Sequence, residues 1–150
     1  MSVANTLIAN KSCSIVVREQ SARQILMFRH PLAGVQLIKG TIEAGEEGWQ
    51  AALRELREEA GIGSAIHKKH LGTWSARFQD QVWAFHLCEV RCSLPDSWVH
   101  QTDDDGGHDF HFFWQPLYTA PPADCDEVFV GALAFVREAL LPQDFLAADD

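Results

Sequence analysis

The sequence lacks several features that mark common classes of protein. Residues 1–11 contain no basic start followed by a long apolar run, and nowhere do 18 apolar residues follow one another. We therefore expect neither a signal peptide nor a membrane span, and a cytoplasmic location. Neither a glycine-rich dinucleotide fingerprint nor a phosphate-cradling G-x-x-x-x-G-K-[ST] loop occurs.

Cysteine pairs and basic residues are also scarce. Cys13, Cys88, Cys92 and Cys125 form no C-x-x-C motif and predict buried, reduced thiols. The 12 basic and 21 acidic side chains give a formal charge of −9, which disfavours duplex DNA and membrane surfaces as partners. A charged small molecule remains compatible with this charge if a metal ion reverses its sign locally.

The composition predicts one compact α/β domain over residues 1–150. A chain of 150 residues with 47% hydrophobic composition can bury a core of its own. Five runs have the composition of strands: residues 12–18, 24–30, 65–76, 81–91 and 108–114. The first two predict a hairpin, and the third and fourth predict an antiparallel pair.

Two segments have helical spacing. Residues 48–60 predict a helix that ends at Gly61, and residues 124–141 predict a second helix with Asp124 as its N-cap and a frayed tail after it. Residues 93–107 predict a long loop. Strands on both sides of the first helix and a helix at the end predict a mixed sheet between helices on two faces, an α/β/α sandwich.

Three carboxylates gather on one face of the first helix. Glu55, Glu58 and Glu59 have the spacing of helix neighbours, and beside them an apolar stripe can face a core: Trp49, Ala52, Leu53, Leu56 and Ala60. Their mutual repulsion predicts a bound cation, and a hard divalent ion such as Mg²⁺ prefers oxygen ligands of this kind. The alternative is a solvated helix face with ordinary ion pairs such as Arg54–Glu58.

The surrounding stretch from Gly40 to Ile62 matches a specific spacing, G-x5-E-x7-R-E-U-x-E-E-x-G-U, in which U is a bulky aliphatic residue. Every specified position agrees: Gly40, Glu46, Arg54, Glu55, Leu56, Glu58, Glu59, Gly61 and Ile62. The stretch resembles the signature of the Nudix hydrolases. This resemblance implies an α/β/α sandwich and metal-dependent cleavage of a phosphoanhydride in a nucleoside diphosphate linked to another group, such as a dinucleoside polyphosphate or a nucleoside triphosphate.

The resemblance also implies roles for individual residues. Glu55, Glu58, Glu59 and the backbone carbonyl of Lys39 look like ligands of Mg²⁺, with Mn²⁺ as an alternative ion. Glu58 or Glu59 would also act as the general base. Arg54 would hold a glutamate through a bidentate pair.

The loop before the helix is expected to serve the backbone and the substrate. Glu46 is interpreted as a brace rather than a metal ligand, and Gly40, Gly45 and Gly61 as backbone requirements. The run around Lys39 is similar to the Pro-Lys-Gly loop of Nudix enzymes that act on dinucleoside polyphosphates, inositol pyrophosphates and RNA 5′ ends, although Ile38 replaces the proline. The Lys39 side chain either binds a substrate phosphate or is an ordinary surface lysine.

More distant candidates are weaker. Family members often supply one more acidic residue, here Asp109 or one of residues 103–105, against the alternative of a solvated acidic loop. Among the aromatic residues, Trp83 is a candidate for stacking on a base, against the alternative of a core residue. His108 and His111 would lie on opposite faces of a strand and are not expected to share a metal.

Two alternatives to a hydrolase follow from the same residues. One is a non-catalytic Nudix module that senses a nucleotide or binds a partner, but all the glutamates of the Nudix signature, which is called the Nudix box below, are present. The other is an isopentenyl-diphosphate-isomerase-like enzyme, which would need a catalytic cysteine near the metal. The exact substrate and the oligomeric state stay open, with a homodimer as one option.

Overall fold

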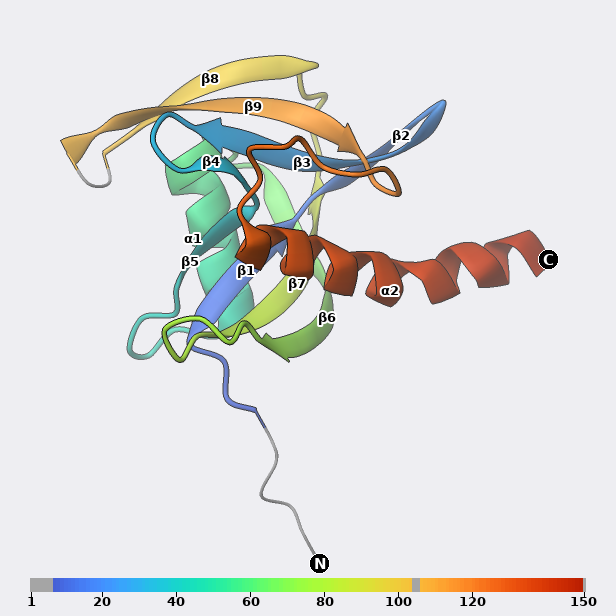
Figure 1. Cartoon of the computed structure of the whole chain (residues 1–150), viewed down its shortest axis with the longest axis horizontal. Coiled ribbons are helices and arrows are strands. Elements are labelled where there is room, and N and C mark those ends of the chain that lie inside the picture. The colour runs from blue at the N-terminus through green and yellow to red at the C-terminus, as the bar shows by residue number, and fades with distance from the viewer. Residues whose placement is uncertain (1–6, 104–105, 150) are drawn as a thin grey trace, which may run out of the picture.

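The computed structural model describes residues 7–103 and 106–149, whose strands form two sheets (Figure 1). The first sheet has four strands in the order β5 (Ile38–Thr41), β1 (Lys11–Ile15), β7 (Val82–Val90) and β6 (Ala65–Ser75). β1 runs parallel to β7, whereas β1 with β5 and β6 with β7 are antiparallel. The sheet is therefore mixed, and the predicted pair formed by residues 65–76 and 81–91 is confirmed.

The second sheet is antiparallel. Its main path is β2 (Val17–Gln20), β3 (Ala22–His30), β9 (His108–Pro116) and β8 (Ser97–Thr102), and β4 (Gly34–Gln36) pairs with β3. The predicted mixed sheet is the first of these sheets, and the second sheet, which faces it across the core (Figure 1), was not predicted as a separate sheet.

The helices α1 (Gly48–Ala60) and α2 (Glu127–Asp149) pack on opposite faces of the first sheet (Figure 1). Alternation along β1 shows this directly. Cys13 lies in a core cluster with Leu133 of α2, whereas the hydroxyl of Ser14 donates to a backbone carbonyl of α1 at 2.7 Å. The expected α/β/α arrangement is confirmed.

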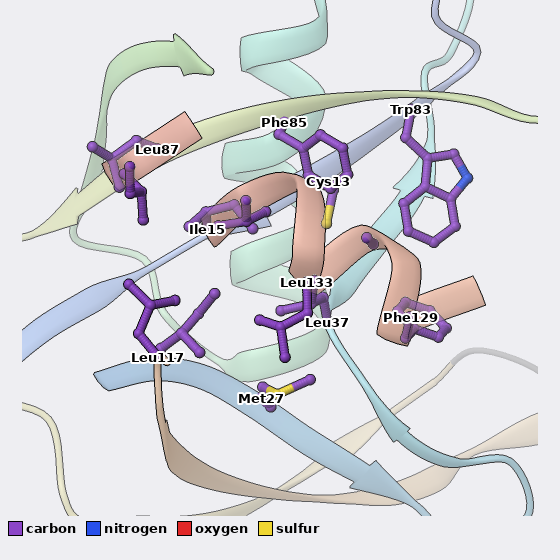
Figure 2. Close-up of a cluster of buried hydrophobic side chains, with 14 of the residues drawn as sticks. Cys13, Ile15, Met27, Leu37, Trp83, Phe85, Leu87, Leu117, Phe129 and Leu133 are labelled. Carbon is purple, nitrogen blue, oxygen red and sulfur yellow. The ribbon is translucent and has the colours of Figure 1, made fainter. Parts of the chain in front are cut away.

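Two clusters of buried side chains form the core. The first lies between α2 and both sheets, and Figure 2 shows Phe85 and Trp83 at the top of the view and Met27 at the bottom, with Leu133 between them. The second lies beneath α1 and combines that helix with the second sheet: Val16, Leu26, Phe28, Ile38, Ala52, Leu56, Ala60, Ile62, Cys88, Phe110, Phe112 and Trp114. Both faces of the first sheet are therefore covered.

The segment predicted as one strand over residues 12–18 serves both sheets. The chain passes from β1 to β2 at Val16, whose carbonyl accepts a hydrogen bond from the backbone N–H of Leu26 at 2.9 Å. The predicted hairpin is formed by β2 and β3 around Ser21, and β1 takes no part in it. A continuous apolar run gives no sign that the strand changes partners.

The loop predicted over residues 93–107 contains strand β8, which corrects that prediction. Trp98 of β8 stacks on Phe112 with ring centroids 5.0 Å apart, and its indole N–H donates to the Ala60 carbonyl at 3.1 Å. These contacts with β9 and α1 order a segment whose local composition favours a loop.

The start and the end of α2 differ from the prediction. The backbone N–H of Val128 donates to Asp126 Oδ1 at 3.0 Å, so Asp126 caps the helix. The predicted cap, Asp124, instead accepts a hydrogen bond from Arg29 Nε at 2.7 Å. The helix continues to Asp149, beyond the predicted end at residue 141.

Two expectations drawn from absences can be compared with the structure. None of the helices in the described ranges has the length and apolar character needed to cross a membrane. All four cysteines are unpaired, but only Cys13 and Cys88 are buried, and Cys92 is exposed.

A cluster of three histidines lies beneath the first turn of α1. His86 of β7 is 6% exposed, its Nδ1 lies 3.0 Å from His67 Nε2, and its Nε2 has no hydrogen-bond partner among the described residues. A Cβ added to Gly48 would lie 2.9 Å from that nitrogen. Irregularities in β6 place both His67 and His70 near His86. Burial, followed by the charges of these two neighbours, lowers the pKa of His86 to about 4.

The free energy of unfolding is expected to fall as the pH drops from about 6.5 to about 4. In the unfolded chain His86 takes up a proton near its ordinary pKa, whereas in the folded protein it does so only near pH 4. The free energy of unfolding is therefore lower by roughly 3 kcal/mol once the pH is below both pKa values. Urea unfolding between pH 7 and pH 4.5 measures the effect. His86→Gln should flatten the dependence and His111→Gln, at an exposed site, should not; equal pH dependence in His86→Gln and the unmodified protein would contradict the assignment.

Candidate active site

α1 turns an apolar stripe toward the second core cluster. Ala52, Leu56 and Ala60 are buried there, as the helical spacing predicts, and Leu53 packs against them. Trp49 was expected in the same stripe but is 42% exposed, because it lies in the first helical turn beside His67 instead. The stripe fixes how the helix is rotated and therefore where its carboxylates point.

Two of the three glutamates are buried next to this stripe. Glu55 and Glu59 are 5% and 9% exposed, whereas the Glu58 side chain is 47% exposed. Burial raises the pKa of Glu55, and the charge of Glu58 acts in the same direction, while hydrogen bonds with Glu59 and Arg54 oppose the shift. Burial therefore disfavours the charged form of Glu55 even with the guanidinium beside it.

Arg54 connects these carboxylates with the preceding loop. Its Nε and Nη2 donate to the two oxygens of Glu46 at 2.7 and 3.0 Å, and its Nη1 donates to Glu55 at 2.8 Å and to Glu58 at 3.1 Å. Nη2 also donates to the Thr41 carbonyl at 2.9 Å. The bidentate partner is thus Glu46, and the planar guanidinium ties the loop to two of the candidate ligands.

Both oxygens of the Glu46 carboxylate accept hydrogen bonds. Besides Arg54, its Oε1 accepts a hydrogen bond from the backbone N–H of Glu43 at 3.0 Å. The Arg54 guanidinium lowers the pKa of the Glu46 carboxyl to about 2. These contacts fit the interpretation of Glu46 as a brace.

Gly40 lies directly against the Glu55 carboxylate. A Cβ built on Gly40 would lie 2.0 Å from Glu55 Oε1 and 2.1 Å from its carboxyl carbon. The requirement for glycine at this position is therefore a close approach of the backbone to the carboxylate. At Gly61, by contrast, a φ of 74° and a hydrogen bond to the Arg57 carbonyl end the helix.

Gly40→Ala is expected to displace the Glu55 carboxylate and to lower kcat by about 10-fold or more, because a shift of about 1 Å in a reacting group can have such an effect. The matched control is Gly63→Ala, since a Cβ added to Gly63 meets no atom within 4 Å. Steady-state kinetics of the two variants measure the difference. Equal turnover in both variants would show that the contact is unimportant.

The glutamates and two lysines line one open depression of about 360 Å³. Its walls are formed by residues of β1, β5, the following loop and α1: Lys11, Lys39, Gly40, Thr41, Glu43, Arg54, Glu55, Glu58 and Glu59. The strand register pairs Lys11 with Thr41 and Cys13 with Lys39, so the two lysines lie diagonally on the same face of the sheet. Negative charge from α1 and positive charge from the sheet edge therefore meet in the depression.

Lys39 is held on the sheet side of the depression. Its Nζ donates to Gln81 Oε1 at 3.2 Å and lies 4.8 Å from the centroid of the Trp83 ring and 5.8 Å from that of Phe129. Burial and the charge of Lys11 lower the pKa of Lys39. It is therefore not an ordinary solvated lysine.

The structure does not bring the weaker candidates into the depression. Trp83 is fully buried beneath Lys39, which supports the core alternative, and stacking on a base would require the ring to be uncovered. Asp109 is an exposed residue of β9 opposite Gln101. Asp103 is also exposed, and residues 104–105 lie outside the described residues. The role assigned to Asp109 stays a prediction.

The similarity to known proteins agrees with this geometry. A family model described as the NUDIX domain matches residues 10–138. The chain belongs to the NUDIX domain family. It is similar to an RNA pyrophosphohydrolase of Rhodopseudomonas palustris (strain BisA53), with 29% identity over 103 residues. That match covers 57% of this chain and 57% of the relative, so the aligned part spans little more than half of the relative's length.

Solved structures of other proteins share the fold. A binary complex of a C. elegans Ap4A hydrolase superposes with a TM-score of 0.61 at 18% identity, covering 93% of this chain and 99% of the other. An ADP-ribose pyrophosphatase from Streptococcus suis 89-1591 gives a TM-score of 0.58 at 16% identity, covering 85% and 90% of the two chains. At these identities the likeness concerns the fold alone.

The Nudix glutamates fit a divalent ion in chemistry and charge. Nudix hydrolases generally use divalent metals. Carboxylate oxygens are the ligands that Mg²⁺ and Mn²⁺ prefer, and a bound cation would stabilise the charged form of Glu55, which burial disfavours. In the described part of this Nudix domain, no three His, Cys, Asp or Glu side chains are already arranged around a common metal position. Arg54 instead contacts both Glu55 and Glu58.

Two residues of the Nudix site, Lys11 and Gln81, were not predicted from the sequence. Lys11 lines the depression, and its Nζ donates to Thr41 Oγ1 at 2.7 Å. Gln81 supports Lys39 from the far end of the β6–β7 connection. Lys11 directly precedes the first predicted strand, residues 12–18, and a basic residue next to a strand end was the one signal available in the sequence.

Proposed function

We propose that the protein is a Mg²⁺-dependent pyrophosphohydrolase that cleaves a phosphoanhydride in a nucleoside diphosphate linked to another group. The observation that carries this proposal is the meeting of Glu55, Glu58 and Glu59 with two lysines in one depression. The complete Nudix box and the family match support the reaction class. The four unpaired cysteines fit a cytoplasmic location.

The box residues would divide the work as follows. Glu55, Glu58, Glu59 and the Lys39 carbonyl would hold Mg²⁺ or Mn²⁺, which supplies Lewis-acid polarisation of a phosphoryl oxygen when bound. Glu58 or Glu59 would take the proton of the attacking water. Arg54 would keep Glu55 and Glu58 oriented through its hydrogen bonds.

The two lysines would bind the phosphate groups of the substrate. Lys11 and Lys39 make no ion pair with a carboxylate among the described residues, and their like charges lie on one face of the sheet. A phosphate between them would relieve this repulsion. The names of the similar proteins, an RNA pyrophosphohydrolase and hydrolases of Ap4A and ADP-ribose, support a substrate with a nucleotide-linked phosphate chain.

The experiment is a substrate screen with and without metal. Nucleoside triphosphates, dinucleoside polyphosphates, ADP-ribose, nucleotide sugars and 5′-triphosphorylated RNA are each incubated with the protein in Mg²⁺ and then in EDTA, and the released phosphate or nucleotide is identified. Turnover that requires Mg²⁺ is expected. Binding without metal-dependent product would instead favour the nucleotide-sensing module.

The isomerase alternative is disfavoured by the position of the thiols. None of Cys13, Cys88, Cys92 and Cys125 lines the depression, and burial raises the pKa of Cys88 to about 12 and that of Cys13 further still. A thiol of this kind is inert as an acid or nucleophile.

A further inference from the structure

The Gln81 side chain binds both Lys39 and Trp83. Its side-chain oxygen accepts a hydrogen bond from Lys39 Nζ at 3.2 Å and another from the indole N–H of Trp83 at 2.9 Å. Since the Lys39 ammonium group also lies over the Trp83 ring, one amide oxygen sets the relation between the lysine and the aromatic surface beneath it.

Lys39 needs such a holder because of its chemistry. A lysine side chain is a flexible stem that carries a point charge, so geometry must come from its partners. Lys39 is partly buried and is repelled by Lys11. A carboxylate at position 81 would also hold the ammonium group, but it would neutralise the charge that a phosphate has to meet. A neutral amide oxygen accepts the hydrogen bond and leaves that charge available.

The turn that delivers Gln81 has an unusual backbone. Arg77, Gln79 and Asp80 have φ values of 54°, 51° and 58°, in the left-handed region that residues other than glycine seldom adopt. Asn10 fixes the turn from β1's side, because its Nδ2 donates to the Asp80 carbonyl at 3.1 Å and its Oδ1 accepts from the N–H of Val82 at 2.9 Å. Strain of this kind persists where the surrounding contacts over-determine a functional geometry.

We propose that Gln81 is a positioning residue that holds the Lys39 ammonium group in place for a substrate phosphate. The inference rests on the proposed function, because it takes Lys39 as a phosphate ligand. Gln81 itself acts only through Lys39 and does not touch the reacting atoms.

A double-mutant cycle tests this inference. Gln81→Leu, Lys39→Met and the double variant are compared with the unmodified protein, and Asp80→Asn serves as a control in the same turn. Gln81→Leu is expected to raise KM by about 10-fold, the effect of one hydrogen bond to a charged group, with kcat changed by less than about twofold. In the Lys39→Met background the same substitution should change KM by less than about twofold. Asp80→Asn should leave KM unchanged.

The outcomes separate positioning from a general structural effect. If Gln81→Leu raises KM equally with and without Lys39, or lowers kcat as much as kcat/KM, the inference is overturned, whatever happens to the Tm. Calorimetric binding of inorganic tripolyphosphate to the same four proteins in Mg²⁺ gives a readout that does not need turnover. The cycle in Kd should show the same loss and the same non-additivity. A protein that hydrolyses no nucleotide but shows this cycle would refute the proposed function and retain the role of Gln81.

Discussion

Glu59→Gln is expected to lower kcat by at least about 100-fold without weakening the fold. The glutamate is 9% exposed and shares a hydrogen bond with Glu55. An amide of the same shape keeps that hydrogen bond but removes both the charge needed for a divalent ion and the capacity to accept a proton. Steady-state kinetics at saturating Mg²⁺ measure kcat, and thermal unfolding monitors the fold.

Glu58→Gln should behave similarly, because Glu58 and Glu59 are the two candidates for the base. Glu89→Gln is the matched control, since Glu89 lies on β7 and pairs with Lys68, outside the depression. If both Glu58→Gln and Glu59→Gln turn over at the rate of the control, the assigned roles are wrong. A large loss in only one of them would identify the base.

Arg54→Met is expected to lower the free energy of unfolding by about 3 kcal/mol and also to reduce kcat. The side chains of Glu46 and Glu55 are 15% and 7% exposed, so removing the guanidinium leaves two poorly solvated carboxylates without a partner. Arg54→Lys should recover only part of the stability, because an ammonium group cannot span Glu46, Glu55 and the Thr41 carbonyl at once.

Urea unfolding at pH 7 measures the loss. Arg57→Met, at an exposed position in the same helix, is the control and should cost less than about 1 kcal/mol. Equal losses for the two arginines would mean that the network around Arg54 contributes no more than a surface charge. A stable Arg54→Met variant with low kcat would confine its role to orienting the glutamates.

The parts of the fold that were predictable depend on local sequence. α1 has its predicted bounds, because helical periodicity and the left-handed Gly61 act within a few residues. Strand β8 and the change of partners at Val16 depend on contacts with distant strands. The sequence pattern indicates that a segment is apolar, but it does not indicate which strand or helix packs against it.

The same distinction holds for the candidate site. The spacing of Glu55, Glu58 and Glu59 places them on one helix face without knowledge of the fold. The surroundings of Lys39 combine β5 with Gln81, Trp83 and Phe129, which only the tertiary structure brings together. Trp83 illustrates the limit, since an aromatic residue in a strand is compatible with either a core or a ligand contact.

The central position of β1 constrains the order in which the protein can fold during synthesis. β1 is hydrogen-bonded in parallel register to β7, so that Lys11 pairs with Trp83 and Ile15 with Leu87. These partners leave the ribosome long after β1, because more than 70 residues separate Lys11 from Trp83. α1 is synthesised before β7, so its buried glutamates have no complete sheet beside them at that stage. The sheet beside the depression is therefore complete only when more than half of the chain has been made.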